Sequence, residues 1–109
     1  MDAPIRLLIH GASGRMGRAL LRLAAAEPGL QVVAAVAPAA EPDVAAPWFT
    51  TLDAVPDFDV AIDFSQPDGF VAVLAACVAR GRPLVSGTTG LAPAQRQALD
   101  TAAVRIPVL

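Results

Sequence analysis

The chain reads Ile5-Arg-Leu-Leu-Ile-His-Gly-Ala-Ser-Gly-Arg-Met-Gly17 near its start, and this stretch decides the fold. An apolar run ends at Gly11, and Gly14 and Gly17 then open a segment with helical periodicity. A strand, a glycine-rich turn and a helix N-terminus in this order are typical of proteins that bind the diphosphate of a dinucleotide. Glycines permit a tight turn and let backbone N–H groups approach phosphate oxygens closely. The spacing G-x-x-G-x-x-G is looser than G-x-G-x-x-G, so a glycine-rich connection that binds nothing is the alternative.

Apolar strands and helical segments alternate along the rest of the chain, which we expect to form one domain over residues 1–109. Alternation with short connections predicts a Rossmann-type fold, a doubly wound parallel sheet of about six strands flanked by helices. The expected strands cover residues 5–9, 31–36, 48–50, 60–64, 83–86 and 106–109.

Three helices connect these strands. The first is expected to bury an apolar face that consists of Met16, Leu20, Leu23 and Ala24, with Gly17 allowing close contact with the sheet. The second is expected to use Ser65 as its capping residue and to end at Gly81. The third is expected over residues 93–103, and Thr51 or Asp53 is expected to cap a brief helical turn.

The composition excludes several classes of protein. Hydrophobic residues make up 55% of the chain and charged residues 17%, which suits a sheet buried on both faces. The net charge of −2 argues against nucleic acid as a partner. No apolar run reaches the length of a membrane span and no signal peptide is recognised, so we expect a cytoplasmic protein that does not bind membranes.

The reactive side chains are few. All 8 cationic residues are arginine, so any step that needs a lysine requires another source. Cys77 is the only cysteine, which excludes an internal disulfide and a thiol metal site, and we expect a packed, inert thiol. His10 is the only histidine, and we expect a strand-end side chain that is packed or hydrogen-bonded locally. No catalytic residue and no metal site is predicted.

Ligands of doubly wound sheets bind at the carboxyl ends of the strands. Two loops besides the first one are unusual there: residues 63–65, Asp-Phe-Ser, and residues 86–90, Ser-Gly-Thr-Thr-Gly. Phe64 offers an apolar plane, and the hydroxyl and N–H groups of both loops suit the ribose and carboxamide of a nicotinamide. The alternative is that threonine-rich turns satisfy their own polar groups.

These motifs, in this order and spacing, resemble the N-terminal half of the dihydrodipicolinate reductase family. The resemblance covers essentially the whole chain. It implies that NADH or NADPH reduces a cyclic, unsaturated dicarboxylate, 4-hydroxy-tetrahydrodipicolinate, in the diaminopimelate route to lysine. The cofactor site predicted from the motifs and the resemblance consists of Gly11, Ala12, Ser13, Gly14, Arg15, Met16, Gly17, Phe64, Ser65, Gly87, Thr88 and Thr89.

The chain departs from the family's pattern at the end of the second strand. Family members commonly have an acidic residue there that bonds the adenosine ribose, and this chain has Ala37. Glu41 and Asp43 follow in a loop over residues 37–47 that is rich in proline and alanine. The preference between NADH and NADPH therefore stays open, and our hypothesis is that Arg15 or Arg18 meets a 2′-phosphate.

The family's catalytic half, with its His-His-x-x-x-Lys and Ser-Gly-Thr segments, is not in this sequence. We therefore expect the substrate domain to be missing, and the 109 residues alone to bind cofactor weakly and to catalyse nothing. The alternatives are a free-standing nucleotide-binding regulatory module and a split subunit that gains its substrate domain by association.

Overall fold

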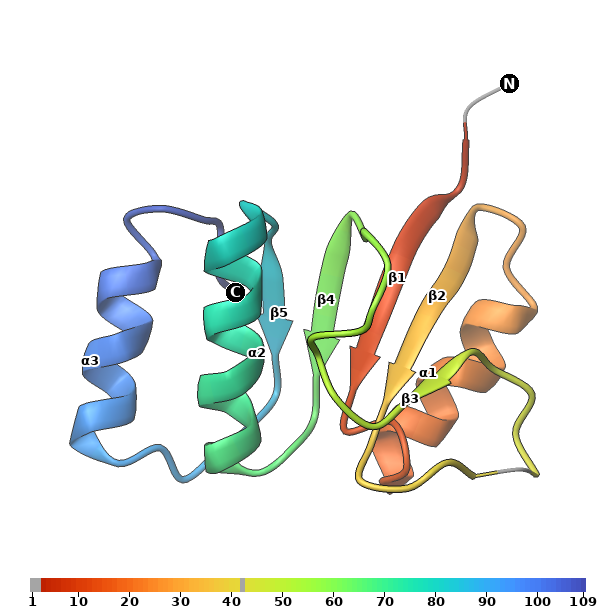
Figure 1. The fold of residues 1–109 in the computed structure, drawn as a ribbon, viewed down its shortest axis with the longest axis horizontal. Helices are drawn as coiled ribbons and strands as arrows, with labels where there is room; N and C mark the ends of the chain where they lie inside the picture. Colours follow the sequence, from red (N-terminus) through yellow and green to blue (C-terminus); the bar gives the residue numbers. More distant parts are fainter. Residues whose placement is uncertain (1–2, 42) are drawn as a thin grey trace.

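The computed structural model describes residues 3–41 and 43–109, so Pro42 of the predicted 37–47 loop lies outside the described residues. A parallel sheet of 5 strands in the order β3-β2-β1-β4-β5 forms the centre (Figure 1). The elements are β1 (Ile5–His10), α1 (Arg15–Ala25), β2 (Leu30–Val36), β3 (Trp48–Phe49), β4 (Val60–Asp63), α2 (Pro67–Arg80), β5 (Leu84–Ser86) and α3 (Pro93–Ala102). This order confirms the Rossmann-type prediction.

Helices cover both faces of the sheet: α1 lies on one face, and α2 and α3 on the other (Figure 1). The central strand β1 shows why. Leu8 and Ile9 are adjacent residues of this strand, and both are 0% exposed. Side chains alternate between faces along a strand, so these two point to opposite faces of the sheet. Leu8 packs in the cluster that contains Phe70 of α2, whereas Ile9 packs in the cluster that contains Leu21 of α1. A strand buried on both faces needs apolar side chains over its buried stretch, and in β1 Leu7, Leu8 and Ile9 supply them.

The buried face of α1 differs from the prediction. The buried residues are Gly17, Leu21 and Ala24, whereas Met16 is 51% and Leu23 69% exposed. A Cβ on Gly17 would lie 2.3 Å from the backbone oxygen of Gly11, so this helix packs directly on the turn through the missing side chain. That contact turns Gly17 inward and moves Met16 and Leu23 toward solvent. Gly17 thus allows close packing as expected, although the backbone it meets is that of the turn. Of the predicted apolar face, Ala24 is buried and Leu20 packs against the same cluster, whereas the prediction is wrong for Met16 and Leu23.

The predicted sixth strand over residues 106–109 is wrong as a strand. The segment forms a single parallel bridge between Val108 and Leu84 of β5, supported by backbone bonds such as Leu84 N–H to Pro107 O at 3.0 Å. Pro107 has no N–H to donate, which limits the ladder that this segment can form. The sheet consequently has 5 strands with a short stretch of chain beside its last edge.

Three further predictions concern the turn near Thr51, the end of α2 and the side chain of Cys77. The turn near Thr51 and Asp53 contains bends and no helix. Gly81 ends α2 with φ of 65°, as predicted for a left-handed cap. Cys77 is buried, which confirms a packed thiol, and burial raises the pKa of this thiol to about 11. Within the described part of the chain, no helix is both long enough and apolar enough to cross a bilayer.

Candidate functional site

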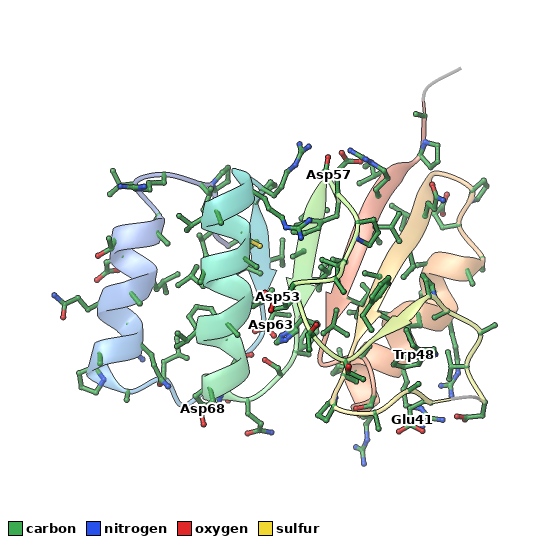
Figure 2. The ribbon with its side chains drawn as sticks, in the orientation of Figure 1. Glu41, Trp48, Asp53, Asp57, Asp63 and Asp68 are labelled. Carbon is green, nitrogen blue, oxygen red and sulfur yellow. The ribbon has the colours of Figure 1, made fainter. Side chains whose placement is uncertain are left out.

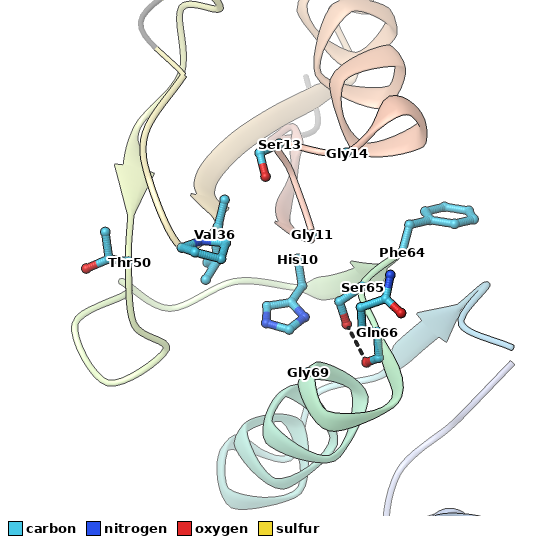
Figure 3. A pocket seen from close by; sticks show the side chains of 12 residues that line it. His10, Gly11, Ser13, Gly14, Val36, Thr50, Phe64, Ser65, Gln66 and Gly69 are labelled. Carbon is cyan, nitrogen blue, oxygen red and sulfur yellow. Dashed lines mark hydrogen bonds between the residues drawn. The ribbon is translucent and has the colours of Figure 1, made fainter. Parts of the chain in front are cut away.

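A pocket of about 560 Å³ opens at the carboxyl ends of the strands, next to the neighbouring strands β1 and β4 (Figure 3). From β1 the chain adds β2 and β3 on one side of the sheet, and it then adds β4 and β5 on the other side. It is lined by the ends of β1, β2 and β4, by the turn after β1 and by the start of α2. This is the switch point of the sheet, where ligands of doubly wound folds bind. The structure therefore brings the first two predicted loops together around one cavity.

The turn after β1 depends on Gly11. This residue has φ of +75°, and a Cβ there would lie 2.7 Å from the backbone oxygen of Phe64. Gly14 differs, because its nearest neighbour to such a Cβ is Gly11 O at 3.5 Å. The fold thus requires glycine at position 11 for its own packing, whereas a Cβ at Gly14, which lines the pocket, would make only an ordinary van der Waals contact.

Backbone N–H groups of this turn are available for a ligand. Gly11 and Ala12 donate to Val36 O at 3.0 and 3.1 Å, and Gly14 donates to Gly11 O. In the described chain no hydrogen bond uses the N–H groups of Ser13, Arg15 or Met16. In addition, α1 has no side-chain cap and no acidic residue in its first turn. Among the described residues, the first turn of this helix therefore carries no capping side chain and no acid of its own, which suits an anion site.

Asp63, at the end of β4, is a residue that the sequence prediction omitted from the site. It is 0% exposed and lies near the centre of the molecule, whereas Asp57 lies at the edge where β4 begins (Figure 2). Its Oδ1 accepts hydrogen bonds from His10 Nδ1 at 2.9 Å and from Ser65 Oγ at 2.6 Å and N at 3.1 Å. Its Oδ2 accepts bonds from Ser86 Oγ at 3.0 Å and Thr88 Oγ1 at 2.6 Å. One carboxylate therefore connects the ends of β1, β4 and β5.

The protonation state of Asp63 follows from this network. Burial by itself raises the pKa of the carboxyl, but the hydrogen bonds from His10, Ser65, Thr88 and Ser86 outweigh it and lower the pKa to about 2. Asp63 is therefore ionised at neutral pH although it is buried. A sequence signal for it existed, since an acid directly follows the apolar run of a central strand.

The same network gives the Ser65 hydroxyl a different hydrogen-bond partner from the predicted one. The predicted capping role is wrong, because Gln66 is the N-cap of α2 and no side chain caps it. Ser65 Oγ donates to the Asp63 carboxylate instead, and an ionised acceptor binds a hydroxyl more strongly than a neutral one. The expected proline and acid in the first turn are present as Pro67 and Asp68.

The loop after β5 is largely satisfied internally. Gly87 N–H donates to Asp63 O at 2.8 Å, Thr88 N–H donates to Ser86 Oγ at 3.2 Å, and the Thr88 hydroxyl donates to Asp63. Thr89 is exposed and has no hydrogen bond within the described part of the chain. The ring of Phe64 lies against Gly87, where a Cβ would be 2.2 Å from its Cε1. Phe64 and this loop are thus in direct contact.

The charged residues near the end of β2 also have defined positions. Ala37 is 3% exposed and lines the pocket, so no carboxylate occupies this strand end. Arg18 forms ion pairs with Asp43 and with Glu41 at 3.6 Å, which shows that the acidic loop folds back onto α1. Arg15 is exposed and forms no ion pair with any described residue. Of the two arginines predicted to meet a 2′-phosphate, Arg18 is therefore already neutralised.

Comparison with known proteins gives a consistent result. Residues 5–109 match the family model described as dihydrodipicolinate reductase, N-terminus. The chain is 60% identical to 4-hydroxy-tetrahydrodipicolinate reductase of Stenotrophomonas maltophilia strain R551-3, over 99% of this chain and 48% of that protein. The corresponding enzyme of Xylella fastidiosa strain M23 is 58% identical over 100% of this chain and 48% of its own length. The chain thus spans about half the length of these relatives.

Solved structures share the fold. Dipicolinate-bound dihydrodipicolinate reductase from Paenisporosarcina sp. TG-14 superposes with a TM-score of 0.75 at 23% identity, over 92% of this chain and 43% of that one. The WlbA dehydrogenase from Thermus thermophilus, in complex with NAD and UDP-GlcNAcA, has a TM-score of 0.75 at 18% identity, over 95% of this chain and 40% of that one. At these identities the likeness establishes the Rossmann-type fold alone.

Proposed function

The chain belongs to the dihydrodipicolinate reductase family, and from this premise we propose that it is the part of a reductase that binds a nicotinamide dinucleotide. The observation that carries the proposal is the turn after β1, which lines the pocket with Gly11, Ser13 and Gly14 and leads into a helix N-terminus whose first N–H groups have no acceptor among the described residues. A diphosphate needs this combination of donors and positive potential. The residues present therefore fit the cofactor.

In this proposal the site has two parts. Residues 11–17 bind the diphosphate through backbone N–H groups, with Ser13 adding a hydroxyl at the pocket wall. The loops that contain Phe64 and residues 86–90 receive the nicotinamide and its ribose. Because the Thr88 hydroxyl is bonded to Asp63, we assign Thr88 to holding its loop in place and Thr89 to meeting the carboxamide.

The proposed activity of the whole protein is that of its relatives. When bound, the cofactor supplies the hydride, and the protein orients it and excludes water. The substrate class would be the cyclic dicarboxylate that the family reduces on the route to lysine, in the cytoplasm. Among the described residues of this chain none is placed to donate a proton to such a substrate, so its own part is binding and orientation.

The test compares two Gly→Ala variants by titration with NADH, followed by calorimetry or by fluorescence of Trp48, the only tryptophan. Gly14→Ala adds a methyl group where the chain leaves space, and we expect about tenfold weaker binding with unchanged folding because the methyl group displaces a phosphate. Gly29→Ala is the matched control, since its Cβ would lie 3.7 Å from the nearest atom and far from the pocket. Wild-type protein that binds no dinucleotide at millimolar concentration would contradict the proposal.

For cofactor preference we propose that both NADH and NADPH bind, and that Arg15 contacts the 2′-phosphate of NADPH. Arg15 is the arginine of the pair without an ion-pair partner among the described residues, and no carboxylate at Ala37 repels the phosphate. Arg15→Ala is expected to weaken NADPH binding about tenfold and NADH binding little, because a charge-assisted bond is lost. Affinities for both cofactors, measured with Arg22→Ala as a control on the same helix, check this. An unchanged ratio of the two affinities would rule out the role.

A further inference from the structure

His10 ends β1 directly before the diphosphate turn, and it is 9% exposed. Its ring extends into the pocket beside Gly69 of α2, where a Cβ would lie 3.1 Å from His10 Cε1 (Figure 3). The absent side chain at Gly69 therefore leaves the space that the imidazole occupies. A side chain held so closely at the pocket floor has a fixed orientation.

The hydrogen bond to Asp63 decides which ring nitrogen carries a proton. Asp63 is an ionised carboxylate and only accepts, so the Nδ1 atom of His10, 2.9 Å from Oδ1, must be the donor. In the neutral ring the other nitrogen, Nε2, is then an acceptor. The tautomer is thus fixed by a bond on the side away from the pocket.

Nε2 has no partner within the described chain. In that part of the molecule no fully buried side-chain nitrogen or oxygen lacks a hydrogen bond, so Nε2 is accessible from the pocket. An acceptor at this position recognises a hydroxyl group. It also lies next to Gly11 on the chain and leans toward β4 and α2, which is the side of the proposed nicotinamide half.

We propose that Nε2 of His10 is a cofactor-binding atom that accepts a hydrogen bond from a hydroxyl of the ribose on the nicotinamide side of the diphosphate. This inference rests on the proposed function, because it assumes that the diphosphate lies on the turn after β1. Asp63 acts through His10 as a positioning residue, since it holds the proton on Nδ1. A metal-ligand role does not fit, because the described residues contain no group of three or more acidic, histidine or cysteine side chains.

The test uses ADP, ADP-ribose and NADH. ADP-ribose adds the second ribose to ADP, and NADH adds the nicotinamide to that ribose. His10→Asn keeps an N–H donor near the position of Nδ1 and removes the atom at Nε2. We expect this variant to bind ADP-ribose and NADH about three- to tenfold more weakly than the wild type, and ADP equally well, because one neutral hydrogen bond to the second ribose is lost. Asp100→Asn, at an exposed position of α3, is a control that should change none of the three affinities.

A second measurement uses the wild type, so it holds even where the variant fails to fold. Since His10 is the only histidine, ¹⁵N-histidine labelling gives the NMR signals of a single imidazole. We expect protonated Nδ1, unprotonated Nε2, and a shift of the Nε2 signal on adding ADP-ribose that ADP does not produce. A neutral ring that carries its proton on Nε2, an Nε2 signal that does not change with ADP-ribose, or a variant with wild-type affinity for ADP-ribose would each overturn the inference. Wild-type protein that binds neither ADP nor NADH would instead refute the proposed function.

Discussion

The carboxylate of Asp63 receives hydrogen bonds from three segments that are far apart in the sequence, at His10, Ser65 and the stretch 86–88. A buried charge is tolerated only when donors compensate the loss of water around it. The same bonds also shape the pocket, because the donors lie at the strand ends and in the loops after β4 and β5, and two of them, His10 and Ser65, line it. At the scale of single residues, stability and the geometry of the proposed site therefore depend on the same group.

Asp63→Asn tests this dependence through pH. The folded-state pKa of about 2 lies below the ordinary value of 3.8, so ionised Asp63 stabilises the fold above about pH 4, and this contribution is lost as pH falls toward 2. We expect the variant to unfold about 2 kcal/mol more easily at pH 7, and this difference to shrink below pH 4.

Urea unfolding at several pH values measures the difference. Asp59 also has a lowered pKa, through its bonds with Arg6 at the far end of the sheet, so Asp59→Asn serves as the comparison. Equal stability of the Asp63 variant and the wild type at pH 7 would show that the network does not stabilise the fold.

Two glycines allow the effect of backbone conformation on stability to be distinguished from the effect of steric fit. Gly11 and Gly90 both have φ of +75°, but only at Gly11 would a Cβ meet backbone atoms, while at Gly90 nothing lies within 4 Å. Gly90→Ala is therefore expected to cost about 1 kcal/mol, and Gly11→Ala more than about 3 kcal/mol or the fold itself. Denaturant midpoints of both variants check this, and similar midpoints would mean that the turn after β1 can rearrange.

At the scale of the elements, packing decided details that periodicity alone did not. The pattern of α1 is compatible with several rotations of the helix about its axis, because leucines occur at positions 20, 21 and 23. Contact between Gly17 and the turn selects one rotation, with Leu21 3% and Leu23 69% exposed. The amphipathic pattern thus predicted that a helix exists, and the close approach at one glycine determined which side faces the sheet.

The two leucines give a matched test of that rotation. Leu21→Ala is expected to destabilise the fold by about 2–4 kcal/mol, because it leaves a cavity against β1 and β2. Leu23→Ala is expected to stay within about 0.5 kcal/mol of the wild type, as is usual for exposed positions. Thermal or urea unfolding of both variants measures the difference, and a larger loss for Leu23 would restore the face predicted from the sequence.

At the scale of the whole molecule, the strand order places three loops from separate parts of the sequence at one edge of the sheet. Because β1 lies between β2 and β4, the turn after β1 and the loop after β4 meet at the switch point and line the pocket. Residues 86–90 follow β5 and lie beside the end of β4, where Gly87 and Thr88 bond to Asp63, but they are not part of the pocket lining. Parallel pairing makes every carboxyl end fall on the same side. The location of the pocket therefore follows from topology, which the alternating pattern of the sequence predicted correctly.

The Rossmann-type architecture, the glycine turn and the loops of the candidate site were all predictable from the sequence. These features are local: they depend on apolar runs, on glycines at fixed spacing and on helix ends, which act within a few residues. The rotation of α1, the absence of a sixth strand, the burial of Asp63 and the accessible nitrogen of His10 follow from packing in the folded chain. The first two depend on how Gly17 meets the turn at Gly11 and how Val108 meets Leu84. The last two depend on the contact between His10 and Asp63, which are 53 positions apart and meet only once the sheet has formed.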